Sequence, residues 1–186
     1  MVSLGSLMLP VVLSAVFVFI TSFLIHMVLK YHAPDYTQLP NEDAVRAAIR
    51  AGNPAPRQYI IPYCKDPKEM QSPEMVQKHM EGPVAVINLR RPAKPTMGPY
   101  LAQWFGFNLV VAFFVAYVAA HTLPAGTEYL EVFRVVGSVT FLAYAAGQFP
   151  AAIWMAKPWP VALKDALDGL IYGLVTAGSF GWLWPR

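Results

Sequence analysis

Four long apolar runs and one polar block alternate along this chain. The apolar runs cover residues 2–29, 99–121, 135–156 and 166–184, and none of the first three contains Lys, Arg, Asp or Glu. In the fourth, residues 169–185 are uncharged. About 20 consecutive apolar residues are enough for a helix to cross a bilayer. We therefore predict a membrane all-α fold with four transmembrane helices, the first over 1–29 and the other three within 99–186.

The polar block, residues 30–98, predicts a small α+β insert between the first and second of these helices. Acidic residues open the segment 42–51 and Gly52 follows it, which is typical of a helix. Ser72-Pro73 predicts the start of a second helix that stops at Gly82. Residues 58–63 and 84–89 favour strands. Because the insert has few large apolar side chains, we expect it to pack against the membrane bundle or another protein.

Small residues recur every fourth position in two of the predicted membrane helices. Residues four apart share one face of a helix, and small side chains let a second helix approach closely in a bilayer. The last helix carries Gly169, Gly173, Ala177 and Gly181, and the second carries Ala112, Ala116 and Ala120. We expect these faces to pack against other helices, with Gly173 close to the backbone of the second or third span.

Composition and charge agree with a membrane protein and add its orientation. The chain is 56% hydrophobic and 13% charged, whereas soluble domains are about 25% charged. Of its 14 Lys and Arg residues, all but Arg134 and Arg186 lie in the insert or at Lys157 and Lys164. The positive-inside rule then puts the insert in the cytoplasm and both termini outside. Lys30 follows the first run and no basic residue precedes it, so we expect an uncleaved anchor. Interfacial anchors are predicted at Trp104, Trp159, Trp182 and Trp184.

His26 is the one candidate cofactor ligand, because it falls inside the first span. A membrane imidazole can ligate haem or a pigment or relay protons, but it can also make a plain helix–helix hydrogen bond. The spacing of His26, His32, His79 and His121 along the chain gives no metal-binding pattern, so no metal site is predicted. The single cysteine, Cys64, excludes an internal disulfide and a thiolate cluster.

We predict structural roles for the remaining polar groups of the four spans. Asp165 and Asp168 suit the first turn of a helix, where the dipole stabilises an acidic group, better than a proton pathway. Four other polar side chains could line a pathway, although tying helices together is the commoner role; they are Gln103, Asn108, Thr140 and Gln148. No Gly-x-Ser-x-Gly, His-Glu-x-x-His, P-loop or dinucleotide motif is present. We therefore predict no catalytic residues and no enzyme activity.

Short segments spread over most of the chain resemble a family of uncharacterised bacterial integral membrane proteins with four helices and a cytoplasmic insert. They are His26–Met27, Asp35–Tyr36, Leu39–Pro40, Gly82–Val86, Phe133–Arg134, Asp168–Tyr172 and Phe180–Pro185. The resemblance implies an architecture and a place in the bacterial inner membrane. It implies no activity.

We predict that the chain is a non-catalytic accessory subunit of a larger membrane complex, with other membrane subunits and lipids as partners and no nucleic acid. An energy-converting complex, photosynthetic or respiratory, is the expected host. The first alternative is a small-molecule carrier or sensor that uses the polar groups of the bundle. The second is a subunit that binds a pigment or haem through His26. No other cofactor is expected.

Overall fold

A computed structural model describes residues 2–186 and separates the chain into two compact units. The first unit holds the helical bundle, residues up to 36 together with 96–186, and the second unit holds residues 37–95. In the part of the chain that the structure describes, three helical segments are long and apolar enough to cross a membrane: Leu4–Leu29, Gly98–Thr122 and Tyr129–Trp154. This much of the predicted membrane architecture is confirmed.

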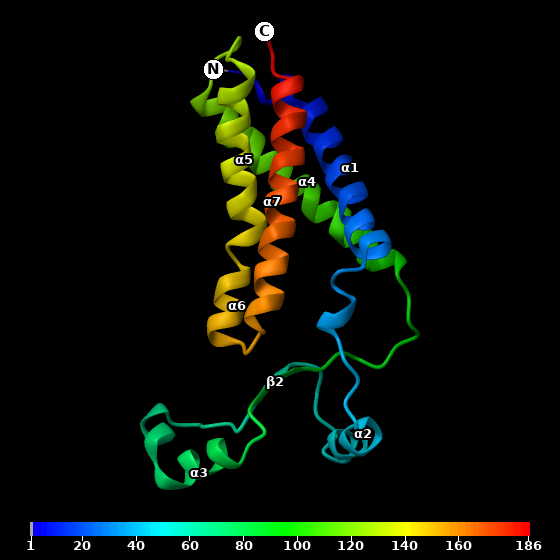
Figure 1. Cartoon of the computed structure of the whole chain (residues 1–186), viewed down its shortest axis with the longest axis vertical. Coiled ribbons are helices and arrows are strands. Elements are labelled where there is room, and N and C mark those ends of the chain that lie inside the picture. Colours follow the sequence, from blue (N-terminus) through cyan, green and yellow to red (C-terminus); the bar gives the residue numbers. More distant parts are fainter. Residues whose placement is uncertain (1) are drawn as a thin grey trace. The chain divides into compact units, whose positions relative to one another are not determined.

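The first segment changes its helical geometry twice (Figure 1). A 3₁₀ turn over Leu4–Leu7 leads into α1, Met8–Phe23, and α1 continues as a π-helical turn over Leu24–Leu29. The backbone N–H of Lys30 donates to the carbonyl of Ile25, 3.1 Å away. Lys30 then adopts a left-handed conformation, with φ of 53°, and this ends the helix. The chain therefore turns sharply after residue 29.

The second and third segments surround a short connection. α4 spans Gly98–Thr122, and α5 begins at Tyr129, so residues 123–128 form the loop. The predicted connection over 122–134 was too long, because only Pro124–Gly126 carries turn residues and nothing after Glu128 breaks a helix. The third segment is also interrupted: α5 ends at Ala145 and α6 covers Gln148–Trp154. Pro150 explains the break, since it has no N–H to offer the carbonyl of Ala146.

α7 spans Trp159–Trp182 and begins seven residues before the predicted start at 166. Pro158 and Pro160 occupy its cap and first turn, where the missing N–H costs nothing. Its early turns carry Lys164, Asp165 and Asp168, which makes α7 less apolar than the other segments. A fourth membrane crossing, by α7, is therefore a proposal.

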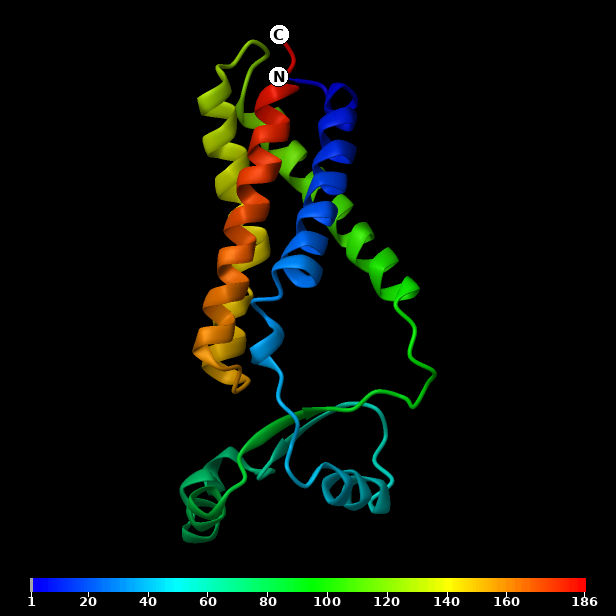
Figure 2. The same ribbon diagram turned by 45° about the vertical axis from the view of Figure 1, so that its right-hand side comes forward.

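The small-residue face of α7 lies against α5, and the two helices run side by side (Figures 1 and 2). A Cβ atom at Gly173 would lie 3.2 Å from the carbonyl oxygen of Gly137 on α5. At Gly169 it would lie 3.1 Å from the backbone nitrogen of Ala145. At Gly181 it would lie 2.7 Å from the ring of Tyr129. The two backbones are thus as close as glycine permits.

Alanine and tryptophan complete the packing of the bundle. Ala112, Ala116 and Ala120 of α4 are all buried, as is Ala177 of α7. Trp159 and Trp182 are exposed, as an interfacial anchor would be, and Trp104 is half-buried. Trp184 is buried, and its indole N–H donates to the carbonyl of Pro124 at 3.0 Å. It fastens the loop between α4 and α5 to the end of α7.

The second unit has the predicted order of helix, strand, helix and strand. α2 spans Glu42–Ala51, β1 Gln58–Ile61, α3 Pro73–Glu81 and β2 Ala85–Asn88, with a 3₁₀ turn over Pro67–Gln71 before α3. The strands are antiparallel, with Gln58 opposite Asn88 and Ile61 opposite Ala85. The Ser72 hydroxyl caps α3 by accepting from the N–H of Met75. Among residues 37–95, Met75 alone is buried, so this unit has almost no core.

Candidate functional site

Two aspartates one turn apart on α7 form the base of a polar cluster inside the bundle unit. Asp165 and Asp168 share a face of the helix, and the Asp168 side chain is only 6% exposed. The Tyr31 hydroxyl donates to one carboxylate oxygen of Asp168. The other oxygen lies 2.9 Å from Nε2 of His32. A carboxylate buried in this way needs such partners, because an unpaired one would strongly oppose folding.

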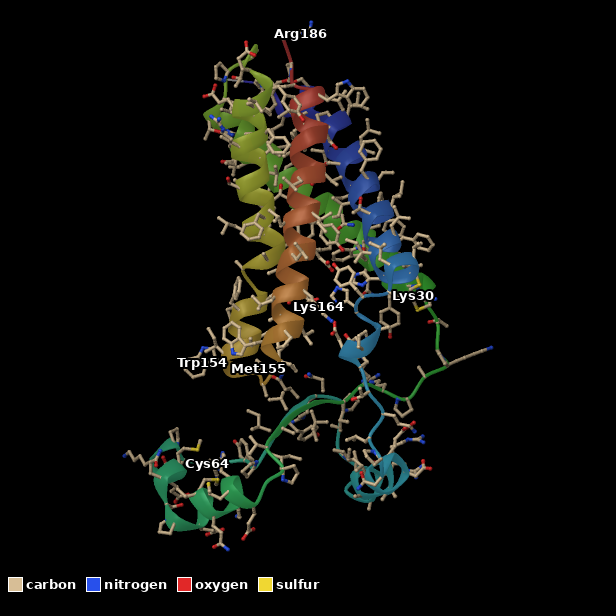
Figure 3. The ribbon with its side chains drawn as sticks, viewed as in Figure 1. Lys30, Cys64, Trp154, Met155, Lys164 and Arg186 are labelled. Atoms are coloured by element: carbon tan, nitrogen blue, oxygen red, sulfur yellow. The ribbon has the colours of Figure 1, made fainter. Side chains whose placement is uncertain are left out.

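His32 is held from its other side by a carboxylate that is itself paired. Its Nδ1 lies 2.8 Å from Asp35 Oδ2, and Lys164 of α7 donates to the other oxygen of Asp35. Lys164, which is labelled in Figure 3, also donates to the backbone carbonyl of Tyr31 at 3.0 Å. The hydrogen bond from Lys164 is the main reason why the pKa of Asp35 is lowered from its ordinary value. The chain Lys164–Asp35–His32 therefore ties the segment after Lys30 to α7.

The local sequence explains why this segment can reach α7. The left-handed Lys30 ends the first helix, and Pro34 favours the short 3₁₀ turn Ala33–Asp35. That turn brings His32 and Asp35, three residues apart, to the same side.

His26 approaches the same aspartate from the π-helical turn. Its Nε2 lies 3.7 Å from Asp168 Oδ2, and its ring centre lies 4.9 Å from that of His32. Its side chain is 42% exposed, so it forms the open side of the cluster. Single π turns inside helices occur frequently at functional sites.

A second ion pair flanks the cluster. Lys157 donates to Asp165 and, at 2.6 Å, to the side-chain oxygen of Gln148 on α6. Asp35 and Asp165 thus each have a lysine partner. Among the residues that the structure describes, Asp168 has none, and its partners are Tyr31 and the two histidines. We call His26, His32 and Asp168 the histidine–aspartate cluster.

A cavity of about 300 Å³ adjoins the histidine–aspartate cluster. All four helical segments contribute to its lining: His26, Trp104, Phe107, Ala143, Tyr144, Gly147, Gln148, Asp165, Asp168, Gly169 and Tyr172. The Tyr144 and Tyr172 rings pack edge to face at 5.3 Å, and the ring of Trp104 lies 6.1 Å from each. The cavity therefore has aromatic walls and a polar, acidic end.

Two buried donors at or next to this cavity are unused. The indole N–H of Trp104 and the side-chain nitrogen of Asn108 have no hydrogen-bond partner among residues 2–186. Asn108 does accept a hydrogen bond through its oxygen, from the Tyr144 hydroxyl at 3.0 Å. Buried polar groups are usually paired, so a donor without a partner in a cavity wall suggests a binding role.

Some of the polar residues singled out from the sequence meet here and others do not. His26, Asp165, Asp168 and Gln148 line the cavity, with Asn108 behind Tyr144. Elsewhere, Gln103 is exposed, the Thr140 hydroxyl donates to the carbonyl of Val136, and His121 and His79 each bond a carbonyl of their own helix.

Four residues of the site lie outside the apolar runs and were not predicted to belong to a site; they are Tyr31, His32, Asp35 and Lys164. The one available signal was the concentration of His, Asp and Lys at the ends of the first and fourth runs. It does not say that these two ends meet.

The histidine–aspartate cluster has a donor set that can hold a metal ion. Each of its residues offers one nitrogen or oxygen ligand, and these atoms lie within 4.8 Å of one another. The expectation of no metal site rested on spacing along the chain, which does not measure distance in the fold. Two imidazoles and a carboxylate form a ligand set used by zinc and by non-haem iron.

No family model, curated protein or solved structure matches the chain. The resemblance to a bacterial membrane protein family therefore stays a prediction.

Proposed function

We propose that this chain is a multi-pass membrane protein that binds a small molecule between its helices, as a carrier or a sensor. The observation that carries the proposal is the cavity of about 300 Å³ to which all four helical segments contribute. Its size is at the lower end of the range of about 300–1,000 Å³ found for ligand pockets. Neither step of this function, binding or release, requires the chain to catalyse a reaction.

The lining of the cavity defines the chemistry of the ligand. Aromatic rings of Trp104, Tyr144 and Tyr172 suit a flat apolar body or a cationic group. Asp165 and Asp168 favour a positive or hydrogen-bond-donating end, and the unused N–H of Trp104 favours an acceptor. We therefore expect a small organic molecule with a ring and a polar or cationic end.

In this proposal α7 is the fourth membrane crossing. Its 24 residues extend about 36 Å, longer than the hydrocarbon core of a bilayer. Its charged residues fall in its early turns, where they bond to Asp35, Lys157 and Tyr31 near one end of the bundle. An even number of crossings fits a bundle in which the first helical segment begins near the place where α7 ends (Figure 1). The basic residues then place the insert in the cytoplasm and both termini outside the inner membrane.

Filling the cavity with a larger side chain tests the binding function. Gly147 lines the cavity, and a Cβ atom there would meet nothing within 4 Å. The phenyl ring of Gly147→Phe should therefore occupy the cavity without a clash at its Cβ atom. The purified chain would be screened by thermal shift against small aromatic amines, amino acids and quaternary ammonium compounds. We expect at least one compound to raise the melting temperature of the wild type but not of Gly147→Phe.

Gly106→Phe is the matched control, because Gly106 also has open space around it but does not line the cavity. It should respond to the compound like the wild type. Equal stabilisation of all three proteins, or no stabilisation by any compound, would argue against the carrier or sensor.

A second function, that of an accessory subunit of a larger membrane complex, is favoured by the insert. Met75 is its one buried side chain, whereas eight of its large apolar side chains are exposed. They are Leu39, Ile60, Ile61, Tyr63, Met70, Val76, Met80 and Val84. A unit with so little core is stabilised most readily by another surface. An energy-converting complex as the host stays a prediction.

Extraction in mild detergent at native expression tests the accessory-subunit function. We expect the chain to migrate with partner subunits, and Met80→Glu to reduce their recovery, because Met80 is 84% exposed on α3. Lys68→Glu, a charge change at an exposed polar position, should leave the recovery of the partner subunits unchanged. A stable monomer, with the same yield in every variant, would leave the carrier or sensor as the better function.

A pigment or haem at His26 also stays a prediction. It requires a visible absorption band in the purified chain that His26→Gln removes.

A further inference from the structure

We propose that His26, His32 and Asp168 bind one divalent first-row transition metal ion, with its open coordination positions at the cavity. This inference rests on the proposed binding function in one respect, because the ion would hold the polar end of the small molecule that binds in the cavity. Two of the three ligands, His26 and Asp168, already line that cavity. None of the three belongs to a metal-binding motif in the sequence.

The distances in the cluster suit a single ion. Bonds of about 2.0–2.2 Å from zinc to imidazole nitrogen or carboxylate oxygen place neighbouring ligand atoms about 3.4 Å apart in a tetrahedral site. Asp168 Oδ2 lies 2.9 Å from His32 Nε2 and 3.7 Å from His26 Nε2, on either side of that value. His26 is on the exposed side and can move by the small amount required.

The hydrogen bonds of His32 leave one ring nitrogen for a metal. Asp35 is paired with the Lys164 ammonium and can only accept, so Nδ1 of His32 must donate to it. If the imidazole is neutral, its lone pair is then on Nε2, which faces the Asp168 oxygen 2.9 Å away. Two acceptors at this distance repel unless a proton or a cation lies between them. A metal ion removes this repulsion by accepting a lone pair from each of the two atoms.

The surroundings resemble the outer shell of metal sites. A ligating histidine commonly donates its second N–H to a carboxylate, which fixes the ring orientation, and Asp35 has this position at His32. Tyr31 donates to the second oxygen of Asp168, which holds that ligand too. The nearby lysines, Lys157 and Lys164, bond to Asp165 and Asp35. Both cations are thus neutralised by carboxylates other than Asp168.

Metal binding by the full chain tests this inference. The detergent-purified protein would be stripped with a chelator and dialysed against Zn²⁺, with Co²⁺ as the spectroscopic probe. We expect one ion per chain and visible Co²⁺ bands. His32→Ala and Asp168→Asn should each weaken binding at least 100-fold, and His26→Gln at least tenfold. Asp35→Asn should weaken it about 10–100-fold through the orientation of His32.

Two histidines outside the cluster serve as controls. His121→Ala and His79→Ala should bind the ion like the wild type, because each ring bonds a carbonyl of its own helix. Melting without metal shows which variants fold, and His26→Gln, at an exposed side chain, is the variant least expected to disturb folding. The inference fails if the wild type binds no ion. It also fails if a folded His26→Gln binds as tightly as the wild type, or if His79→Ala loses the ion.

Gly147→Phe separates this inference from the binding function. It should retain the ion while losing the organic ligand. If no ion binds but an organic molecule still stabilises the wild type and not Gly147→Phe, the metal inference alone falls. If an ion binds and no organic molecule does, the carrier or sensor falls and the ion site remains.

Discussion

Two of the three carboxylates near the cavity are paired with a lysine, and the third is held by a tyrosine and two histidines. Asp35 has Lys164, Asp165 has Lys157, and Asp168 has a tyrosine and two histidines. Asp35 and Lys164 are 129 residues apart in the sequence, whereas Lys157 precedes α7 and lies eight residues before Asp165. The pairings therefore hold the segment 30–35 and the start of α7 in fixed positions around the cavity.

Replacing one partner of such a pair should lower the stability of the protein more than replacing both partners. In Lys164→Met, Asp35 keeps its charge in a mostly buried place with only His32 beside it, so we expect a lower melting temperature. Asp35→Asn combined with Lys164→Met should recover part of the loss. The two proteins would be compared by thermal melting in the same detergent.

Lys78→Met is the matched control, because Lys78 pairs with Glu74 at 2.6 Å on the exposed face of α3. Exposed ion pairs contribute little, so its melting temperature should stay that of the wild type. A double variant less stable than Lys164→Met would show that the pair is not what stabilises this segment.

At the scale of elements, the contact between α5 and α7 depends on glycine. Gly137 and Gly173 face each other, and a Cβ at Gly137 would lie 3.3 Å from that of Ala177. Without these small residues the helices could not approach so closely, and the wall of the cavity that they share would change shape.

One extra methyl group measures how tight this contact is. Gly173→Ala places a Cβ 3.2 Å from the Gly137 carbonyl and 3.4 Å from the Phe141 nitrogen, both of them backbone atoms. We expect a loss of about 1–3 kcal/mol in stability, the usual cost of overpacking. Gly178→Ala on the same helix meets only the Tyr129 hydroxyl at 3.7 Å and should be neutral. Equal melting of the two variants would show that α5 and α7 can separate freely.

Local signals predicted the elements of the insert well and the ends of the membrane helices less well. Gly52 and Ser72 act over a few residues, so the end of α2 and the start of α3 lie where they were predicted. α7 begins earlier than its apolar run because Lys164 and Asp165 are accommodated by Asp35 and Lys157, which only the fold reveals. The break at Pro150 was foreseeable from proline chemistry, but we predicted an uninterrupted span.

At the scale of the whole molecule, the proposed orientation in the membrane rests on charge alone. Twelve of 14 basic residues lie in the insert or at Lys157 and Lys164, and Cys64 lies in that insert (Figure 3). The candidate site could not be predicted in the same way. Its residues come from the first, second, third and fourth segments, and apolar periodicity does not say which helices are neighbours.

The single cysteine makes the orientation measurable. A membrane-impermeant thiol reagent should leave Cys64 unlabelled in intact spheroplasts and label it after detergent is added. In a Cys64→Ser background, Ala125→Cys should be labelled in intact spheroplasts, because Ala125 is exposed in the loop between α4 and α5. Labelling of Cys64 without detergent would reverse the topology.

The π turn over Leu24–Leu29 sets the rotational phase between the two histidines. An α-helix advances about 100° per residue, and a π turn accommodates one additional residue without a loop. Deleting Val28, which is 60% exposed, should let this turn become α-helical. Because the deletion removes the one residue that the π turn absorbs, the chain after it should keep nearly its present direction, and His32 should stay beside Asp168. If all residues of this turn were α-helical instead, the chain after it would rotate by about 100° and carry His32 away from α7.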